Sequence, residues 1–191
     1  MTEDELKPPD FWEIYHEFYH SVRSFIAAML RDDWAADDLA QETFLSAKQN
    51  LASLREPGKL KPWLYRIARN KCLDHFRRAA VSREQADERA GEGPDLKQNL
   101  VQLQLERSEM SSCVQEKIDK LPEAYRTVLI LFDLAGMSHQ EIAEVLEGKE
   151  GTVKVRLHRA RKALKEILAR ECTFEQDERN VLVCLPVEDG S

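Results

Sequence analysis

Apolar residues recur at intervals of three and four along most of the chain, the spacing that places them on one face of an α-helix. This pattern predicts helices from Phe11 to Leu30, from Trp34 to Asn50 and from Pro62 to Arg78, with a loop over residues 51–61 that contains a Pro-Gly pair. The apolar face comprises Ala36, Leu39, Thr43 and Ala47 on the second helix, and Leu64, Ala68, Cys72 and Phe76 on the third. The three helices are therefore predicted to form a small bundle.

A second set of helices is predicted toward the C-terminus. A nearly apolar helix, Glu123 to Ala135, is followed by Ser138, which is expected to cap a short helix because Glu141 three residues later completes a capping box. Gly148 and Gly151 are expected where the chain turns sharply. A longer helix is then predicted from about residue 152.

This longer helix has one apolar and one basic face. The apolar face comprises Val153, Leu157, Ala160, Leu164 and Ile167, and the opposite side comprises Lys154, His158, Arg161, Lys162 and Lys165. A short helix, a turn and a longer helix with these faces are typical of a DNA-binding helix-turn-helix, whose basic side meets phosphates and base edges. The alternative interpretation is a solvated charged face on an ordinary helical hairpin.

The stretch between the two sets, residues 79–99, is polar and contains two glycines and a proline, so it is interpreted as a flexible linker. A further helix is suggested from Leu96 to Ile118. The predicted fold is all-α, with two small helical domains joined by this linker. The boundaries are 1–79 for the first domain, 80–114 for the linker, 115–170 for the second domain and 171–191 for a C-terminal tail.

The tail leaves two hypotheses open. It contains strand-like residues over 180–187, and Cys172 and Cys184 bracket an acidic run. A frayed or loosely docked terminus is one interpretation. A regulatory segment that docks on a domain or contacts a partner is the other, and a redox pair between the two cysteines is a weaker variant of it.

Composition restricts the chemistry. The four cysteines of the 191 residues lie far apart and the five histidines are scattered, so neither a metal site nor a catalytic constellation is indicated. We therefore expect no enzyme activity and no cofactor. The N-terminus is too acidic for a signal peptide, and no apolar run is long enough to span a bilayer, so a cytoplasmic location without membrane insertion is expected.

The charge distribution changes this picture. The net charge is -7, which disfavours nucleic-acid binding by the chain as a whole. However, Lys61 to Arg78 contains six basic residues and one acidic residue, and Lys149 to Arg170 contains eight and two. Local basic stripes determine phosphate binding, so two separate DNA-binding faces are predicted.

Two of the predicted helices also have unusual outer faces. The third combines Trp63 with Arg66, Arg69, Asn70 and Arg77, a mixture that suits single-stranded DNA because aromatic rings stack on unpaired bases. The second exposes Asp38, Gln41, Glu42 and Leu45, a set that suits docking to a basic partner. In both cases plain solvated helix faces remain an alternative.

Four segments together resemble the sigma-70 family of bacterial transcription initiation factors. They are DDLAQETFLSA, PWLYRIARNKCLDHFRR, LPEAYRTVLILFDLAGMSHQEIAEVL, and the block Gly-Thr-Val-Lys-x-Arg-Leu-x-Arg-Ala-Arg. The likeness covers residues 11–78 and 115–168, in the family's order and with a variable linker between them. This compact layout resembles the extracytoplasmic-function (ECF) sigma factors.

The resemblance implies roles for the candidate residues. The last helix would read the -35 promoter element through Thr152, Lys154, Val155, His158, Arg159, Arg161 and Lys162. The third helix would recognise and melt the -10 element through Trp63, Arg66, Arg69, Asn70, Lys71 and Arg77, with a base pocket in the loop 51–61. The second helix would bind polymerase through Asp37, Asp38, Gln41, Glu42, Phe44 and Leu45. His158, Lys149 and Glu150 depart from the family's common residues, which leaves the -35 sequence open.

The implied partners are core RNA polymerase, at its β′ clamp helices and β flap, promoter DNA, and an anti-sigma factor of the kind that is often membrane-anchored. Two other classes are weighed against this hypothesis. A stand-alone helix-turn-helix regulator does not need residues 34–78, and an interaction module that only mimics a sigma factor does not need the basic face of residues 63–78.

Overall fold

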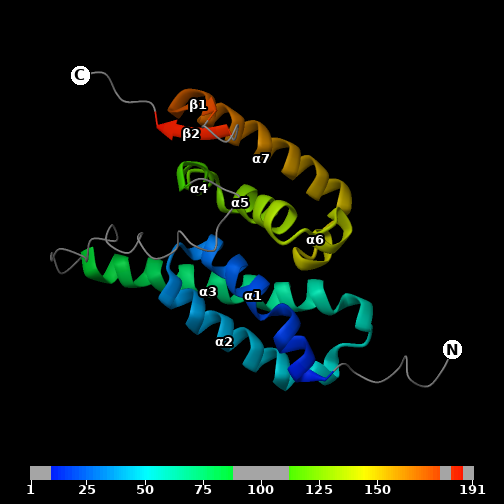
Figure 1. Cartoon of the computed structure of the whole chain (residues 1–191). Helices are drawn as coiled ribbons and strands as arrows, with labels where there is room; N and C mark the ends of the chain where they lie inside the picture. The colour runs from blue at the N-terminus through cyan, green and yellow to red at the C-terminus, as the bar shows by residue number, and fades with distance from the viewer. Residues whose placement is uncertain (1–9, 88–111, 177–181, 187–191) are drawn as a thin grey trace.

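The structure is a computed structural model that describes residues 10–87, 112–176 and 182–186. These residues form two helical units and a short C-terminal hairpin (Figure 1). The first unit contains α1 (Phe11–Leu30), α2 (Asp33–Asn50), two 3-10 turns, η2 (Leu51–Ser53) and η3 (Pro57–Lys59), and α3 (Leu60–Asp87). The second contains α4 (Ser112–Asp119), α5 (Glu123–Leu129), a π-helical turn η5 (Ile130–Leu134), α6 (His139–Val145) and α7 (Glu150–Glu171). The predicted all-α fold of the two units is confirmed.

The first unit is held by a tight α1–α2 turn and by α3, which crosses both helices. Arg31 has a left-handed backbone (φ 61°) at the end of α1, and Asp32 then caps α2 by accepting a hydrogen bond from the Ala35 N–H at 3.1 Å. The apolar faces predicted for α2 and α3 are buried, apart from the half-buried Phe76. The sequence pattern therefore predicted correctly which sides of these helices form the core.

The third helix is longer than predicted. It continues to Asp87, so residues 80–87 of the predicted linker are helical. Arg, Gln, Glu and Ala dominate this stretch and are good helix formers. Val81, near its start, is exposed. The rest of the linker, including the start of the helix suggested from Leu96, lies outside the described residues.

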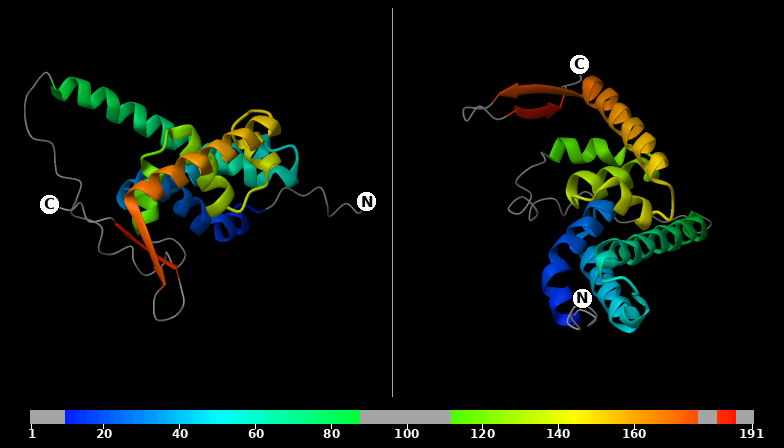
Figure 2. Two further views of the ribbon diagram at one scale, coloured as in Figure 1. Left: turned by 90° about the horizontal axis from the view of Figure 1, so that it is seen from above. Right: turned by 90° about the vertical axis from the view of Figure 1, so that its right-hand side faces the viewer.

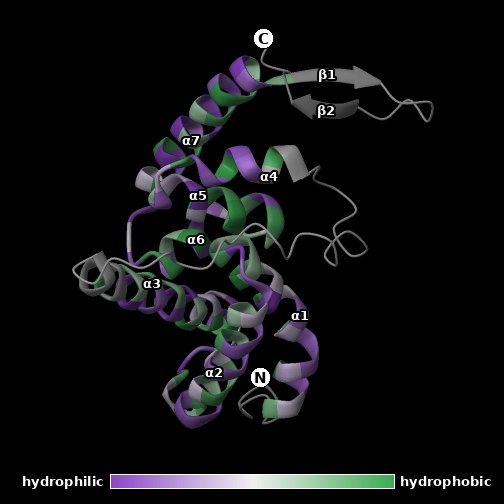
Figure 3. Ribbon diagram, turned by 90° about the vertical axis from the view of Figure 1, so that its left-hand side faces the viewer, coloured by the Kyte–Doolittle hydropathy of each residue, from purple (hydrophilic) through white to green (hydrophobic). Residues whose placement is uncertain are grey.

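The second unit contains the predicted helix-turn-helix. Ser138 caps α6 through the complete capping box, with Ser138 N–H donating to Glu141 at 2.8 Å and Glu141 N–H donating to the Ser138 hydroxyl at 3.2 Å. The buried faces of α6 and α7 then pack on α5 and η5. Figure 3 shows hydrophobic and hydrophilic residues alternating along these helices, as burial of one face requires.

The turn between α6 and α7 differs from the prediction. The residue with the left-handed backbone is Glu147 (φ 52°), and Gly151 lies inside the first turn of α7. Gly148 N–H donates to Ala143 O at 2.8 Å and Glu147 N–H donates to Glu144 O at 3.3 Å, the pair of bonds that defines a Schellman motif. Gly148 thus lies in the turn as predicted, whereas Gly151 does not, and the left-handed position is occupied by a glutamate.

The C-terminal tail forms an antiparallel hairpin of β1 (Cys172–Gln176) and β2 (Leu182–Pro186). This corrects the interpretation of a frayed terminus for these ten residues and adds two strands to an otherwise helical chain. Cys172 lies opposite Pro186, and Cys184 lies opposite residue 174, so the two cysteines are not direct cross-strand partners. The side chain of Cys184 lies outside the described residues.

The two helical units pack directly against each other (Figure 2). Buried residues of α1, such as Met29, form one continuous core with buried residues of α5 and η5. Lys61 of α3 donates to Ala135 O after η5 at 2.9 Å, and Arg31 and Asp119 pair across the units at 2.9 Å. The described parts of the chain therefore adopt one closed arrangement.

The capping box leads to a first prediction. Substituting Ser138 by Ala leaves a helix-terminal N–H of α6 without its partner, so the free energy of unfolding should fall by about 1 kcal/mol in urea titration. Ser24, exposed on α1, provides the control, because Ser24→Ala removes a hydroxyl of the same size without a cap. Equal losses in the two variants would contradict the capping role.

A second prediction concerns the end of α7. Lys120, directly after α4, and Lys117, within α4, contact the carboxylate of Glu171 and lower its pKa to about 2. Because this pKa lies below the ordinary value of 4.5, the stabilisation is complete above that value and is lost as the pH falls toward the folded pKa.

The melting temperature of Glu171→Gln should therefore lie below that of the wild type at neutral pH, and the difference should shrink steadily below about pH 5. A difference that stays constant down to about pH 3 would show that the carboxylate charge is not what ties α4 to α7. The matched control is Glu166→Gln, an exposed α7 carboxylate that lies 3.9 Å from Lys162 of the same helix.

Candidate nucleic-acid and polymerase interfaces

The exposed side of α7 gathers the residues predicted to read the -35 element. Val153, Leu157 and Ala160 are buried against α5, which turns the remaining face outward and away from the first unit. Thr152, Lys154, Val155, His158, Arg159, Arg161 and Lys162 are all exposed. The structure therefore brings the whole predicted set onto one accessible helix face.

Ion pairs divide this face into two parts. Lys154 pairs with Glu150 at 2.7 Å, and Arg161 pairs with Asp133 at 2.7 Å while its guanidinium lies 4.9 Å from the Phe132 ring centroid. Arg161 is thus held against its own domain. Arg159 makes no ion pair with any described residue, so its five donors are available to phosphates or to a guanine edge.

The residues predicted to act at the -10 element are less uniform. Asn70 and Arg77 are exposed, and Arg77 pairs with Asp74 at 2.7 Å. Lys71 instead pairs with Glu42 of α2 at 3.0 Å. A residue predicted to bind DNA is therefore paired with one predicted to bind polymerase. Arg69 is half-buried, and its Nε atom has no hydrogen-bond partner among the described residues. Outward presentation of the -10 set is therefore clearest for Asn70 and Arg77, whereas Trp63 and Arg66 are half-buried.

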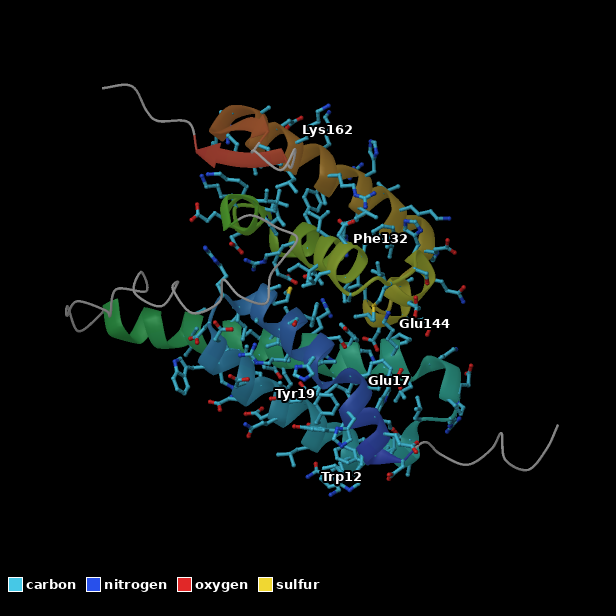
Figure 4. All side chains as sticks on the ribbon, viewed as in Figure 1. Trp12, Glu17, Tyr19, Phe132, Glu144 and Lys162 are labelled. Carbon is cyan, nitrogen blue, oxygen red and sulfur yellow. The ribbon has the colours of Figure 1, made fainter. Side chains whose placement is uncertain are left out.

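A pocket of about 250 Å³ lies beside Trp63 and Arg66, where a base pocket was predicted. The loop before α3 forms most of its wall through Ser53, Leu54, Arg55, Glu56 and Lys59, and α3 adds Pro62, Trp63 and Arg66. One further lining residue, Glu144, comes from α6 of the second unit. Figure 4 shows Glu144 on the side of that unit that faces α3. Sequence reasoning missed Glu144, because no local pattern relates residue 144 to residues 53–66.

The predicted polymerase-binding residues of α2 fall into exposed and internally paired groups. Asp38, Gln41 and Leu45 are exposed, with Leu45 at 60% of its full accessibility. Asp37 accepts hydrogen bonds from Arg23 of α1, at 3.0 Å for one of them, and this bond lowers the pKa of Asp37. The carboxylates of Asp37 and Glu42 are therefore both engaged in ion pairs within the first unit.

Phe44 requires a correction. It is 2% exposed and packs on Tyr15 and Tyr19, with ring centroids 5.1 and 5.8 Å away. Because its side chain is in the core, it positions α2 and does not offer a surface contact. An exposed apolar residue that the sequence pattern did not select is Trp34 at the start of α2, with 79% of its surface accessible.

Two general findings concern the described part of the chain. No group of three or more His, Cys, Asp or Glu side chains in it is arranged to hold a metal ion. None of the helices in it is long and apolar enough to cross a membrane.

Comparison with known proteins agrees with this geometry. Residues 14–81 match the family description Sigma-70 region 2, and residues 111–164 match Sigma-70, region 4. ECF RNA polymerase sigma factor SigM of Bacillus subtilis is 32% identical over 83% of this chain and 94% of its own length. ECF RNA polymerase sigma factor SigW of the same organism is 35% identical over 83% of this chain and 88% of its own.

Two solved structures share the fold. The sigma factor RpoE from Bartonella quintana, in complex with the anti-sigma factor NepR, superposes with a TM-score of 0.67 at 24% identity, covering 84% of this chain and 97% of RpoE. CnrH in complex with the cytosolic domain of CnrY gives 0.60 at 26% identity, covering 84% of this chain and 88% of CnrH.

A helical bundle followed by a helix-turn-helix domain with a basic face is the architecture of a two-domain transcription factor. The chain belongs to the sigma-70 family, within its extracytoplasmic-function RNA polymerase sigma factors. It is an alternative sigma factor that directs transcription initiation, and sigma factors are initiation factors rather than classical enzymes. The hypothesis of a stand-alone regulator is not favoured.

The α7 face leads to a third prediction. In holoenzyme bound to a promoter selected from random duplex DNA, Arg159→Ala should weaken binding by roughly 1–3 kcal/mol and relax the preference at one base pair. Arg170→Ala, at the far end of the same helix, should leave the base preference unchanged. A uniform loss for all sequences, with a smaller salt dependence, would instead assign Arg159 to a phosphate.

Proposed function

We propose that the two domains divide promoter recognition between them. The face of α7 around Val155, His158 and Arg159 enters the major groove of the -35 element, while Lys154 and Lys162 face the backbone. Arg161 reaches the backbone only if it leaves Asp133, with which it pairs at 2.7 Å. What supports this is the exposure of the whole set on a helix whose opposite face is buried. Contacts of the basic side chains with phosphates would fix the position of α7 along the DNA, and contacts with base edges would give the sequence preference.

The first domain would recognise the -10 element as a single strand. Trp63 and Arg66 border the pocket of about 250 Å³, and Asn70 and Arg77 continue the exposed face along α3. Extruding a base costs a few kcal/mol of stacking and pairing energy, which a pocket and a stacking ring can repay. Melting would thus be driven by binding, without any catalytic group.

The observation that best supports the assignment to polymerase binding is the exposed face of α2. Asp38, Gln41 and Leu45 place an acid, an amide and an apolar side chain on one side, while the opposite side of α2 is the core of the domain. A partner surface with basic groups around an apolar site would match it, and the β′ clamp helices of core RNA polymerase are the proposed partner. The second domain would bind at the β flap, in the cytoplasm where core polymerase acts.

An anti-sigma factor is a further proposed partner. The structurally similar RpoE of Bartonella quintana was solved in complex with the anti-sigma factor NepR, and CnrH was solved in complex with the cytosolic domain of CnrY. The exposed α2 face and the α7 face are the surfaces that such an inhibitor would have to cover.

A fourth prediction tests the docking face. Leu45→Arg places a cation on the α2 face and should weaken binding to purified core RNA polymerase at least tenfold, with a matching loss of run-off transcription. Val81→Arg is the matched control, because Val81 is similarly exposed, at 53%, but lies near the far end of α3.

Circular dichroism should show equal folding of the two variants. Wild-type protein that binds DNA but not core polymerase would contradict the proposal, and so would unchanged polymerase affinity of the Leu45→Arg variant.

A further inference from the structure

The exposed face of α2 is a single stripe with a regular repeat. Its exposed residues between positions 34 and 48 follow each other at intervals of four, three, four and three residues: Trp34, Asp38, Gln41, Leu45 and Lys48. An ideal helix departs from a seven-residue repeat by only about 20° per heptad, so these side chains stay in one narrow line. At about 1.5 Å per residue, this line is about 21 Å long.

This repeat indicates which kind of partner fits the stripe. Two helices that cross at about 20° keep a seven-residue seam in contact along their length, as in coiled coils and helical bundles. An extended strand repeats every two residues and does not follow this spacing. The stripe is therefore suited to a partner helix that runs along α2.

Large apolar side chains lie along the stripe and at both of its ends. Six large hydrophobic residues are strongly exposed in the described part of the chain, and three of them, Trp12, Trp34 and Leu45, lie here. Trp34 begins the stripe. Trp12 of α1 is 58% exposed and lies at the other end, where the Lys48 Nζ is 5.6 Å from its ring centroid. Figure 4 shows Trp12 at the end of the first unit that points away from the second unit.

Core packing does not account for the position of Trp34. It is the second residue of α2, after the cap at Asp32, and it lies outside the core cluster of the described residues. The apolar contact that often closes a helix N-terminus would join residues 31 and 36 here, so Trp34 has no part in it. Single exposed apolar residues are common, but several on one face form the kind of patch that marks an interaction site.

Polar residues lie between the apolar ends. Asp38 offers a carboxylate and Gln41 an amide, and neither pairs with any other described residue. Their neighbours Asp37 and Glu42 form ion pairs within the first unit, so Asp38 is the carboxylate of this face that a partner can use. A helix with a cation opposite Asp38 and apolar sites toward both ends would be complementary. Polar contacts fix the register of two helices, whereas buried aromatic rings supply most of the affinity.

We propose that Trp34 and Trp12 anchor the docking of core RNA polymerase: one helix of the β′ clamp lies along the stripe from Trp34 to Lys48 and buries an indole ring at each end. The inference rests on the proposed polymerase-binding function of α2. It extends the docking face beyond residues 37–45, which the sequence resemblance selected, to the first turn of α2 and to a second helix, α1. The two indole rings then determine where along α2 the partner helix lies.

The test measures the affinity of the full chain for purified core RNA polymerase. Trp34→Ala and Trp12→Ala should each weaken binding at least tenfold, because a tryptophan buried at an interface is typically a hot spot. Val81→Ala, at an exposed apolar residue of α3, is the control and should leave the affinity unchanged. An affinity equal to that of the control, for either tryptophan variant, would overturn the proposal.

Thermal unfolding separates docking from a structural role of the ring. Because Trp34 is exposed in the free protein, Trp34→Ala should melt close to the wild-type temperature. Trp34→Phe keeps an aromatic ring and should recover most of the affinity that the alanine variant loses. A large drop in melting temperature for Trp34→Ala, or a phenylalanine variant that binds as weakly as the alanine variant, would overturn the anchoring role.

A photo-crosslinker identifies the surface that receives Trp34. The aromatic side chain of p-benzoylphenylalanine has a similar bulk, and irradiation of holoenzyme that carries it at position 34 should attach it to the β′ clamp helices. The same group at position 81 should give no such product. Attachment of the position 34 crosslinker to a different polymerase surface would contradict the proposal.

The Leu45→Arg variant distinguishes this inference from the proposed function. If Leu45→Arg loses polymerase binding while both tryptophan variants bind as the control does, the anchors fail and the docking function of α2 stands. If the wild-type protein does not bind core polymerase, the proposed function itself fails.

Discussion

Burial of one face of each helix is the constraint on which the rest of this structure depends. Val153, Leu157 and Ala160 anchor α7, and Leu64, Ala68 and Cys72 anchor α3. Because the faces of a helix are fixed relative to one another, burying these residues determines which side chains point outward. Core packing therefore determines which residues form the proposed DNA-facing and polymerase-facing sets. The rigidity of the core determines how accurately these side chains are positioned.

Segregation of charge resolves the apparent conflict between a net charge of -7 and DNA binding. Basic residues are concentrated on α3 and α7, whereas acidic residues lie on α2 and α6. Two acidic residues of these regions form ion pairs with the basic helix α3: Glu42 pairs with Lys71, and Glu147 pairs with Arg66. An acidic chain can thus present two basic faces, because local charge and not net charge determines phosphate binding.

Most of the features that the sequence predicted correctly depend on residues close together in the chain. The helix spans, the capping box of Ser138 and the inward sides of α2 and α3 follow from short-range patterns. The errors have physical reasons as well. Residues 80–87 are polar enough for a linker but also good helix formers, and Gly151, expected in the turn, lies inside the first turn of α7. Phe44 matched a motif that describes sequence neighbours, not accessibility.

The helical architecture of the two units, the helix-turn-helix and the two basic faces follow from the sequence alone, because each depends on residues close together in the chain. Which of those side chains are accessible to a partner depends on the tertiary structure. Glu144 reaches the pocket beside Trp63, and Asp119 lies between Arg31 and Arg126, through the packing of segments many residues apart. Such contacts depend on how the two helical units pack against each other, and the periodicity of one helix does not encode the position of another.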